Sequence, residues 1–212
     1  MPAYLFDLDG VVIHSMPMHV RAWEVYLERH GIAPRDLRTR MLGKHNTELV
    51  AHFWGPQETF DHGAAKEALY REMMEPVFED HLVPGVVEFV KTIEGPKAIG
   101  SNAERPNIDF TLARAGLREM FSAIVSGDDV ANPKPLPDVY LKAAELLGAN
   151  PQDCIVFEDS PTGVAAARAA GMRVVGVETG GALDEVDLRI PDFRHPALRD
   201  WLERVRPNGA RQ

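Results

Sequence analysis

Near its start the 212-residue sequence reads Tyr4-Leu5-Phe6-Asp7-Leu8-Asp9-Gly10-Val11-Val12, an apolar run that ends on two acids. Such a run is typical of a strand that is buried on both faces of a parallel sheet. Side chains two positions apart in an extended segment point the same way, so we expect Asp7 and Asp9 to face one site. Two close carboxylates repel unless a cation or a shared proton relieves them, and Mg²⁺ is the expected cation. An ordinary Asp-Gly turn is the alternative.

Outward from this stretch, the chain divides into a helical segment and a segment in which helices alternate with strands. Between residues 15 and 81 the pattern is helical, with expected helices near 20–27, 35–42, 47–54 and 65–73. Strands are expected at 97–100, 123–125, 154–157 and 174–177, with helices between them. This alternation predicts a doubly wound, Rossmann-like α/β core with a parallel sheet, formed by residues 1–14 and 82–212, and a helical insertion at 15–81. The tail from 207 to 212 is expected to be disordered.

The composition excludes several classes of function. A net charge of -9 makes nucleic acids and anionic membranes poor partners, since both are bound through basic patches. No apolar run approaches the length of a membrane span, and we expect no secretion signal. The one cysteine, Cys154, excludes an intramolecular disulfide and lies in an apolar run, where a buried inert thiol is expected. Together these features favour a cytoplasmic protein.

Polar residues also follow the later expected strands. They are Ser101-Asn102, Asp128-Asp129 and Glu158-Asp159, and Lys134 stands between prolines that are expected to hold it extended. At one sheet edge these groups would supply a nucleophile, an acid–base, a metal site and a cation for phosphoryl transfer. Each has an ordinary alternative: a helix cap for Ser101, a solvated charge for Lys134, acids at a helix N-terminus for Glu158 and Asp159, and a polar loop for Asp128-Asp129.

With these motifs in this order, the sequence resembles the haloacid dehalogenase superfamily, in its phosphatase and phosphomutase branch with an α-helical cap. The resemblance rests on Asp7-Leu8-Asp9-Gly10-Val11, Ser101-Asn102, Lys134-Pro135-Leu136-Pro137-Asp138 and Phe157-Glu158-Asp159-Ser160. It implies that Asp7 is the nucleophile that carries an aspartyl-phosphate and that Asp9 is the general acid and base. It further implies Mg²⁺ held by Asp7, the backbone carbonyl of Asp9 and Asp159, with Glu158 at its edge. Ser101 and Lys134 would hold the phosphoryl group, and residues 15–81 would be the cap.

The same resemblance suggests substrate-binding residues. His19 lies where cap-bearing proteins that resemble β-phosphoglucomutase have a histidine near the active site, although a surface histidine on a helix is an equal alternative. Gly43-Lys44-His45-Asn46 resembles the specificity loop of the cap, so Lys44 and Asn46 are expected to contact substrate, as is Asn102 of the second motif.

We therefore expect a Mg²⁺-dependent phosphatase that acts on a small phosphorylated metabolite, as a monomer or a homodimer. A β-phosphoglucomutase-like hexose-phosphate mutase is the alternative. A mutase must bind a second phosphate, yet the matching positions Ala103-Glu104 and Asn46 provide no positive charge, so Lys44 would have to supply it. His19 keeps the mutase alternative open. A haloacid dehalogenase needs neither Asp9 nor a metal site. The complete set of catalytic groups also argues against a non-catalytic binding module.

Overall fold

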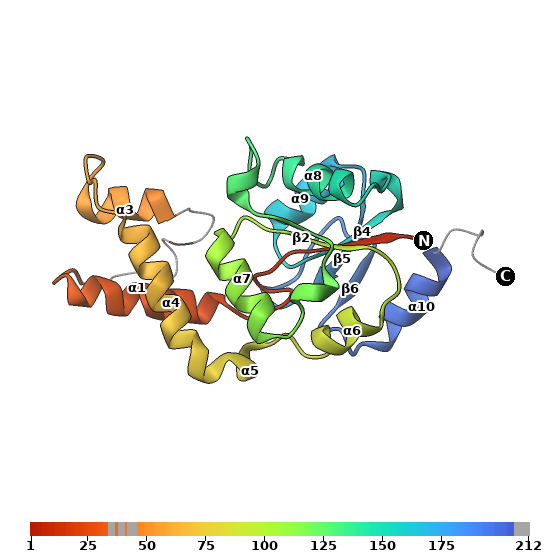
Figure 1. Ribbon diagram of the computed structural model, residues 1–212, viewed down its shortest axis with the longest axis horizontal. Coiled ribbons are helices and arrows are strands. Elements are labelled where there is room, and N and C mark those ends of the chain that lie inside the picture. The colour runs from red at the N-terminus through yellow and green to blue at the C-terminus, as the bar shows by residue number, and fades with distance from the viewer. Residues whose placement is uncertain (34–36, 38–40, 42–45, 206–212) are drawn as a thin grey trace. The chain divides into compact units, whose positions relative to one another are not determined.

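The computed structural model describes residues 1–33, 37, 41 and 46–205 (Figure 1). Internal contacts divide the chain into two units. The core unit comprises Met1–His14 and His81–Gln212, and the helical unit comprises Ser15–Asp80. None of the described helices is long and apolar enough to cross a membrane.

The core unit is built on a six-stranded sheet in which every strand pairing is parallel, in the order β3-β2-β1-β4-β5-β6. The strands are β1 (Ala3–Phe6), β2 (Lys97–Gly100), β3 (Ala123–Val125), β4 (Cys154–Glu158), β5 (Arg173–Val177) and β6 (Leu188–Ile190). The first apolar run thus forms a central strand, as predicted. Strand β6 was not predicted from the sequence, because its three residues include an exposed arginine and are too few to show a pattern.

Helices cover both faces of this sheet, which confirms the predicted doubly wound α/β core. Figure 1 shows α8 (Asp138–Leu146) and α9 (Pro161–Ala169) on one face, and α6 (Val86–Thr92) and α10 (Pro196–Val205) on the other. The remaining core elements are α7 (Arg105–Arg114) and three short 3₁₀ helices, η2 (Arg118–Met120), η3 (Gly127–Asp129) and η4 (Pro151–Asp153).

Side-chain alternation along β1 and β4 explains their register. Leu5 and Val156 belong to a small-residue core that also contains residues of α8 and α9. On the opposite face Phe6 stacks on Phe157 with ring centroids 4.7 Å apart, and Phe89 and Phe193 pack around this pair. A slip of one residue would exchange the two faces, so burial on both sides fixes the pairing of Phe6 with Phe157.

The helical unit consists of α1 (Met16–Arg29), α3 (Asn46–Trp54), α4 (His62–Met74), η1 (Glu75–Val77) and the first residues of α5 (Phe78–His81). Its described core contains Trp23, Tyr26, Leu27, Leu49 and Leu69. The expected helix at 35–42 lies mostly outside the described residues, and the break at Gly43 and the expected disordered tail lie wholly outside them.

Candidate active site

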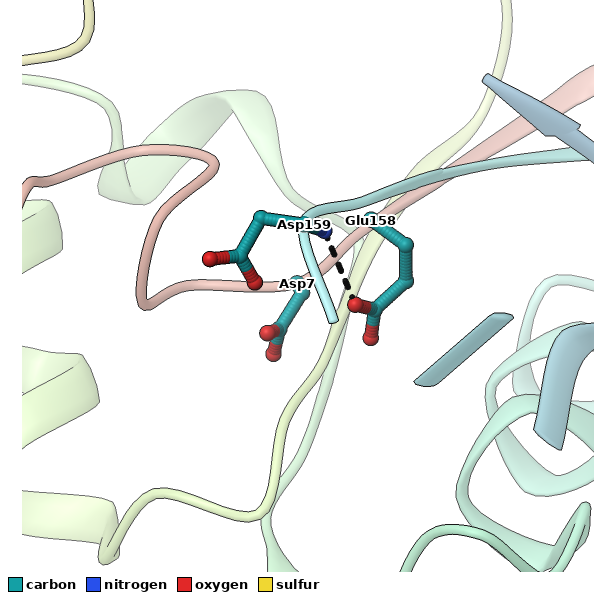
Figure 2. A group of neighbouring side chains, drawn as sticks. All are labelled: Asp7, Glu158 and Asp159. Atoms are coloured by element: carbon teal, nitrogen blue, oxygen red, sulfur yellow. Dashed lines mark hydrogen bonds between the residues drawn. The ribbon is translucent and has the colours of Figure 1, made fainter. Parts of the chain in front are cut away.

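The pairing of β1 with β4 brings the first acid beside the last two. Asp7 follows β1, and its N–H donates to the Phe157 carbonyl at 3.0 Å, so its side chain lies level with Glu158. Oxygens from Asp7, Glu158 and Asp159 lie within 4.8 Å of one another. Figure 2 shows the Glu158 and Asp159 carboxyl groups extending to opposite sides of the segment that joins them. The carboxyl edge of the sheet therefore brings Asp7 beside two acids that follow it by 151 and 152 positions in the sequence.

Glu158 is fully buried, and five protein donors surround its carboxylate. Its Oε1 accepts from Lys134 Nζ at 2.6 Å and from the Tyr140 hydroxyl at 2.7 Å. Its Oε2 accepts from the backbone N–H groups of Asp159 and Ser160 and from the Ser160 hydroxyl, at 3.0 to 3.1 Å. Ser160 is also the N-cap of α9, since its hydroxyl accepts from the Gly163 N–H. Glu158 thus links the lysine to the start of α9.

Lys134 is buried and lies between two carboxylates. Its Nζ is 3.0 Å from Asp7 Oδ1 and 2.6 Å from Glu158 Oε1, and it lies 4.7 Å from the centre of the Tyr140 ring. Lys134 lies in a turn that is closed by the Leu136 N–H, which donates to the Pro133 carbonyl at 3.1 Å, and an extended backbone at Lys134 itself stays a prediction. The Asn102 side chain holds this turn: its Oδ1 accepts from the Lys134 N–H at 3.1 Å, and its Nδ2 donates to the Lys134 carbonyl at 3.4 Å. Asn102 was expected to bind substrate, which stays a prediction.

Tyr140 belongs to this cluster but was not singled out from the sequence. It is buried on α8, and there is so little space between its ring and β2 that a Cβ at Gly100 would lie 3.1 Å from the ring. Tyr140 lies on the apolar face of an amphipathic helix, so the sequence pattern indicates an ordinary aromatic residue of the core. Its contacts with Glu158 and with the Lys134 ammonium distinguish it from other core aromatics, and both depend on tertiary packing.

The segment that carries Asp9 is a tight turn rather than a continuation of β1. The strand ends at Phe6, and the Leu8 carbonyl accepts from three successive N–H groups, those of residues 11–13. Gly10 adopts φ +76°, and a methyl group on it would overlap the Asp159 carboxyl group. The extended geometry from which a shared direction of Asp7 and Asp9 was predicted therefore ends early. Asp9 still lies close enough to Asp7 and Asp159 for its charge to act on both.

Two further polar segments follow strands of the sheet: Ser101 follows β2, and Asp128-Asp129 follow β3. Ser101 is buried directly after β2, where its Oγ accepts from the Ala103 N–H at 3.2 Å. Asp128 and Asp129 lie in η3, and Asp129 forms a reciprocal capping box with Ser126. The carboxylate of Asp129 is thus used to hold its own loop, in agreement with the ordinary polar loop expected from the sequence.

The carboxyl groups outnumber the positive charges around them. Burial, and then the charges of Asp7, Glu158 and Asp9, raise the pKa of Asp159 to about 8. Burial likewise raises the pKa of Asp7 to about 7, although Lys134 opposes this rise. Burial alone would raise the pKa of Glu158, but Lys134 and the other donors lower it. Raised pKa values mean that the nearby positive charge is too small to stabilise all of these carboxylates in their ionised form. A bound cation would stabilise them, and a cluster of carboxylate oxygens is a ligand set that fits Mg²⁺.

The described substrate-binding candidates of the helical unit lie in a network of their own. His19 stacks on Tyr70 with ring centroids 3.8 Å apart, and its Nδ1 is 3.3 Å from Lys66 Nζ and 3.5 Å from Glu67 Oε2. Asn46 Nδ2 donates to Glu67 Oε1 at 2.7 Å. Burial raises the pKa of Glu67, but the charges of His19 and Lys66, together with hydrogen bonds from Asn46 and Lys66, outweigh it and lower this pKa to about 2. No sequence pattern singled out Lys66 or Glu67, and Lys44 lies outside the described residues.

Comparison with known proteins covers nearly the whole chain. The family model of haloacid dehalogenase-like hydrolases matches residues 1–171, which include every candidate site residue named above from the sequence. Hexitol phosphatase A of Escherichia coli (strain K12) is 31% identical over 200 residues, covering 87% of this chain and 88% of that protein. Beta-phosphoglucomutase of Bacillus subtilis (strain 168) is 30% identical over 199 residues, covering 89% and 88%. A crystal structure of a family IA, variant 3 hydrolase from Entamoeba histolytica HM-1:IMSS has a TM-score of 0.81 at 27% identity, covering 96% and 98%.

Proposed function

The chain belongs to the haloacid dehalogenase-like hydrolases, a family of enzymes, and we propose that it is a Mg²⁺-dependent phosphatase of small phosphorylated sugars or similar metabolites. The observation that carries the proposal is the cluster of Asp7 and Asp159 with the buried ammonium of Lys134. A carboxylate beside a fixed cation and a metal-binding acid has what a nucleophile in phosphoryl transfer needs.

In the first step, a carboxylate oxygen of Asp7 forms a bond to phosphorus while the bond from phosphorus to the leaving oxygen breaks. Asp9 gives its proton to that oxygen, so the alcohol leaves neutral. In the second step, Asp9 takes a proton from water as the water oxygen bonds to phosphorus. The bond to Asp7 then breaks, which restores the carboxylate and releases phosphate.

Lys134 and Ser101 would hold the transferring group. Lys134 is fixed by Glu158, Tyr140 and the turn that Asn102 holds, so its charge needs little reorganisation during the reaction. Asp7, Asp159 and the backbone carbonyl of Asp9 would hold Mg²⁺, with Glu158 at its edge. When bound, Mg²⁺ neutralises charge on the carboxylates and on the phosphoryl oxygens.

We propose that the helical unit serves as the cap that limits access of water, with hinges near His14-Ser15 and His81-Leu82. The two connections leave the core unit side by side, because the His14 N–H donates to the His81 carbonyl at 2.7 Å and Ile13 pairs with Leu82. Adjacent connections of this kind allow an inserted unit to move as one body. Hydrogen exchange of these four residues, measured with and without a phosphate analogue, tests the assignment.

Hydrolysis is favoured over the mutase reaction because, among the residues that the structure describes, the positions expected to bind a second phosphate carry no positive charge. The side-chain amide of Asn46 donates to Glu67, so it is directed at a carboxylate of its own unit. Glu104, which precedes α7, would repel a phosphate. Water is therefore the expected acceptor, and little β-glucose 1-phosphate should be converted to glucose 6-phosphate.

The test is a screen for phosphate release from sugar phosphates, phosphoglycolate and nucleoside monophosphates, each with Mg²⁺ and with excess chelator. Wild-type protein should release phosphate from at least one of them only with Mg²⁺, and Asp7→Asn should abolish turnover. Asp109→Asn is the matched control, because it removes a carboxylate that pairs with Arg105 on the exposed side of α7. Acid-quenched wild-type protein should gain the mass of one phosphoryl group, and Asp7→Asn should not.

Full activity in chelator, or an active Asp7→Asn variant, would overturn the assignment of Asp7 and its metal. If isomerisation primed by a hexose bisphosphate outran hydrolysis on the same substrate, the mutase would be the correct function.

A further inference from the structure

Thr179 lies two residues after β5, beyond the residues that match the family model and outside all four motifs. Its Oγ1 donates to the Gly10 carbonyl at 2.7 Å, and the same atom is 3.4 Å from Asp159 Oδ2. One hydroxyl thus contacts the turn directly after Asp9 and the carboxyl group that follows β4.

The packing around Asp159 explains why this contact matters. On one side, the Asp159 carboxyl group fills the space that a side chain at position 10 would need. On another side, a Cβ at Gly180 would lie 3.4 Å from Asp159 Oδ2 and from the Asp159 carbonyl oxygen. The carboxyl group is therefore enclosed between the Gly10 turn and the Thr179-Gly180 turn. Thr179 provides a hydrogen bond that joins these two turns.

We propose that Thr179 is a positioning residue that holds the Asp9–Gly10 turn and the Asp159 carboxylate in the arrangement that binds Mg²⁺. This inference rests on the proposed function, because it assigns Asp159 to the metal. A hydroxyl has a single hydrogen, and the shorter contact directs it mainly to the Gly10 carbonyl. Thr179 therefore acts first on the turn, whose Asp9 carbonyl and carboxylate the reaction uses, and keeps that turn packed against Asp159.

The experiment compares Thr179→Val, which keeps the side-chain shape and loses the hydroxyl, with Thr179→Ser, which keeps the hydroxyl. Mg²⁺ alone is titrated into each folded protein by calorimetry, without substrate. Loss of a group that orients a metal ligand weakens metal binding by about 10- to 100-fold, so Thr179→Val should lose affinity in this range. Thr179→Ser should stay within about threefold of wild type. With Mg²⁺ in excess, the KM of Thr179→Val for the phosphoester should remain near the wild-type value, because the proposed role of Thr179 is to hold the Gly10 turn and Asp159.

Thr92→Val is the matched control. The Thr92 hydroxyl also donates to a backbone carbonyl, that of Glu88 at 2.8 Å, but at the end of α6. It should lose some stability and no Mg²⁺ affinity. Should Thr179→Val fail to fold, Thr179→Ala is measured in the same titration.

Unchanged Mg²⁺ affinity in the folded variant without the hydroxyl would overturn the proposal, as would an equal loss in Thr179→Ser. If wild-type protein binds Mg²⁺ but releases no phosphate from any substrate, the proposed function fails while the titration still decides the role of Thr179.

Discussion

Gly10→Ala should separate the strain of a left-handed backbone from the displacement of the Asp159 carboxyl group, the proposed Mg²⁺ ligand. Gly10 has φ +76° and Gly171, at the end of α9, has φ +75°, so alanine meets nearly the same backbone strain at both positions. The surroundings differ, because a methyl group at position 10 overlaps the Asp159 carboxyl group and one at position 171 meets no atom within 4 Å. Gly171→Ala is therefore a matched control within the same unit.

The shared cost follows from chirality. A left-handed conformation costs an L-residue about 1–2 kcal/mol, and the reduced freedom of the unfolded chain offsets about 0.4–1 kcal/mol of it. Both variants should thus lose about 1 kcal/mol of unfolding free energy from this source. Gly10→Ala must in addition push Asp159 away. A displacement of about 1 Å at a reacting centre can reduce the rate by about 10²-fold, which is the loss expected in kcat/KM for Gly10→Ala alone.

The assay combines urea denaturation with steady-state phosphate release and a Mg²⁺ titration of the folded proteins. Gly171→Ala should lose stability and keep both kcat/KM and Mg²⁺ affinity. Gly10→Ala should lose stability, activity and Mg²⁺ affinity together. Equal kcat/KM in the two variants would refute the reasoning, because it would mean that the position of Asp159 does not depend on the absence of a side chain at residue 10.

Asp9→Asn should reduce kcat by about 10²- to 10⁴-fold in phosphate-release assays, since general acid–base help is of this size, and a near-normal rate would exclude that role. Tyr140→Phe removes a buried donor to Glu158 and should lower the unfolding free energy by about 1.5–3 kcal/mol in urea, a loss that an unchanged midpoint would contradict. The folded state raises the pKa of Asp7 to about 7 and of Asp159 to about 8, so it binds more protons than the unfolded chain. The stability that these two groups contribute is fully present below about pH 4. It is lost as pH rises through about 7–8, because both groups then become charged in the folded protein. Mg²⁺ would compensate these charges, so the increase in Tm that it causes should grow between about pH 6 and 8. Melting curves recorded with Mg²⁺ and with chelator test this prediction. A Mg²⁺-induced increase in Tm that became smaller from about pH 6 to about pH 8 would contradict it.

The central strands were predictable because each is a continuous run of apolar residues, which indicates burial on both faces of the sheet. The run before Asp7 and the run before Glu158 are apolar throughout, and each ends where its side chains become charged. The start of α9 was predictable for a similar reason, since Ser160 followed by Pro161 is a local signal for a helix N-terminus. Parallel strands then bring their carboxyl ends to one edge, which is enough to expect a common site.

The supporting contacts were not predictable, because they join residues that only the fold brings together. Tyr140 meets Glu158 across 18 positions, and Asn102 meets Lys134 across 32. Thr179 meets Gly10 across 169 positions. Asn102 stood out only as a polar residue after an expected strand, and the local sequence around Tyr140 and Thr179 gave no signal, so hydrophobic periodicity predicts none of these contacts. The turn at Lys134 was missed because the flanking prolines restrict the backbone without deciding where the chain goes next.

The two adjacent acids Glu158 and Asp159 serve different purposes because their side chains leave the end of β4 in opposite directions (Figure 2). Glu158 extends to the side where five protein donors lower its pKa, so its charge is already compensated by the protein. Asp159 extends to the side of Asp7, where burial and neighbouring acids raise the pKa of both. A cation gains most where charge is least compensated, so Mg²⁺ should bind between Asp7 and Asp159. Glu158 then acts chiefly through Lys134, by holding its ammonium group against Asp7.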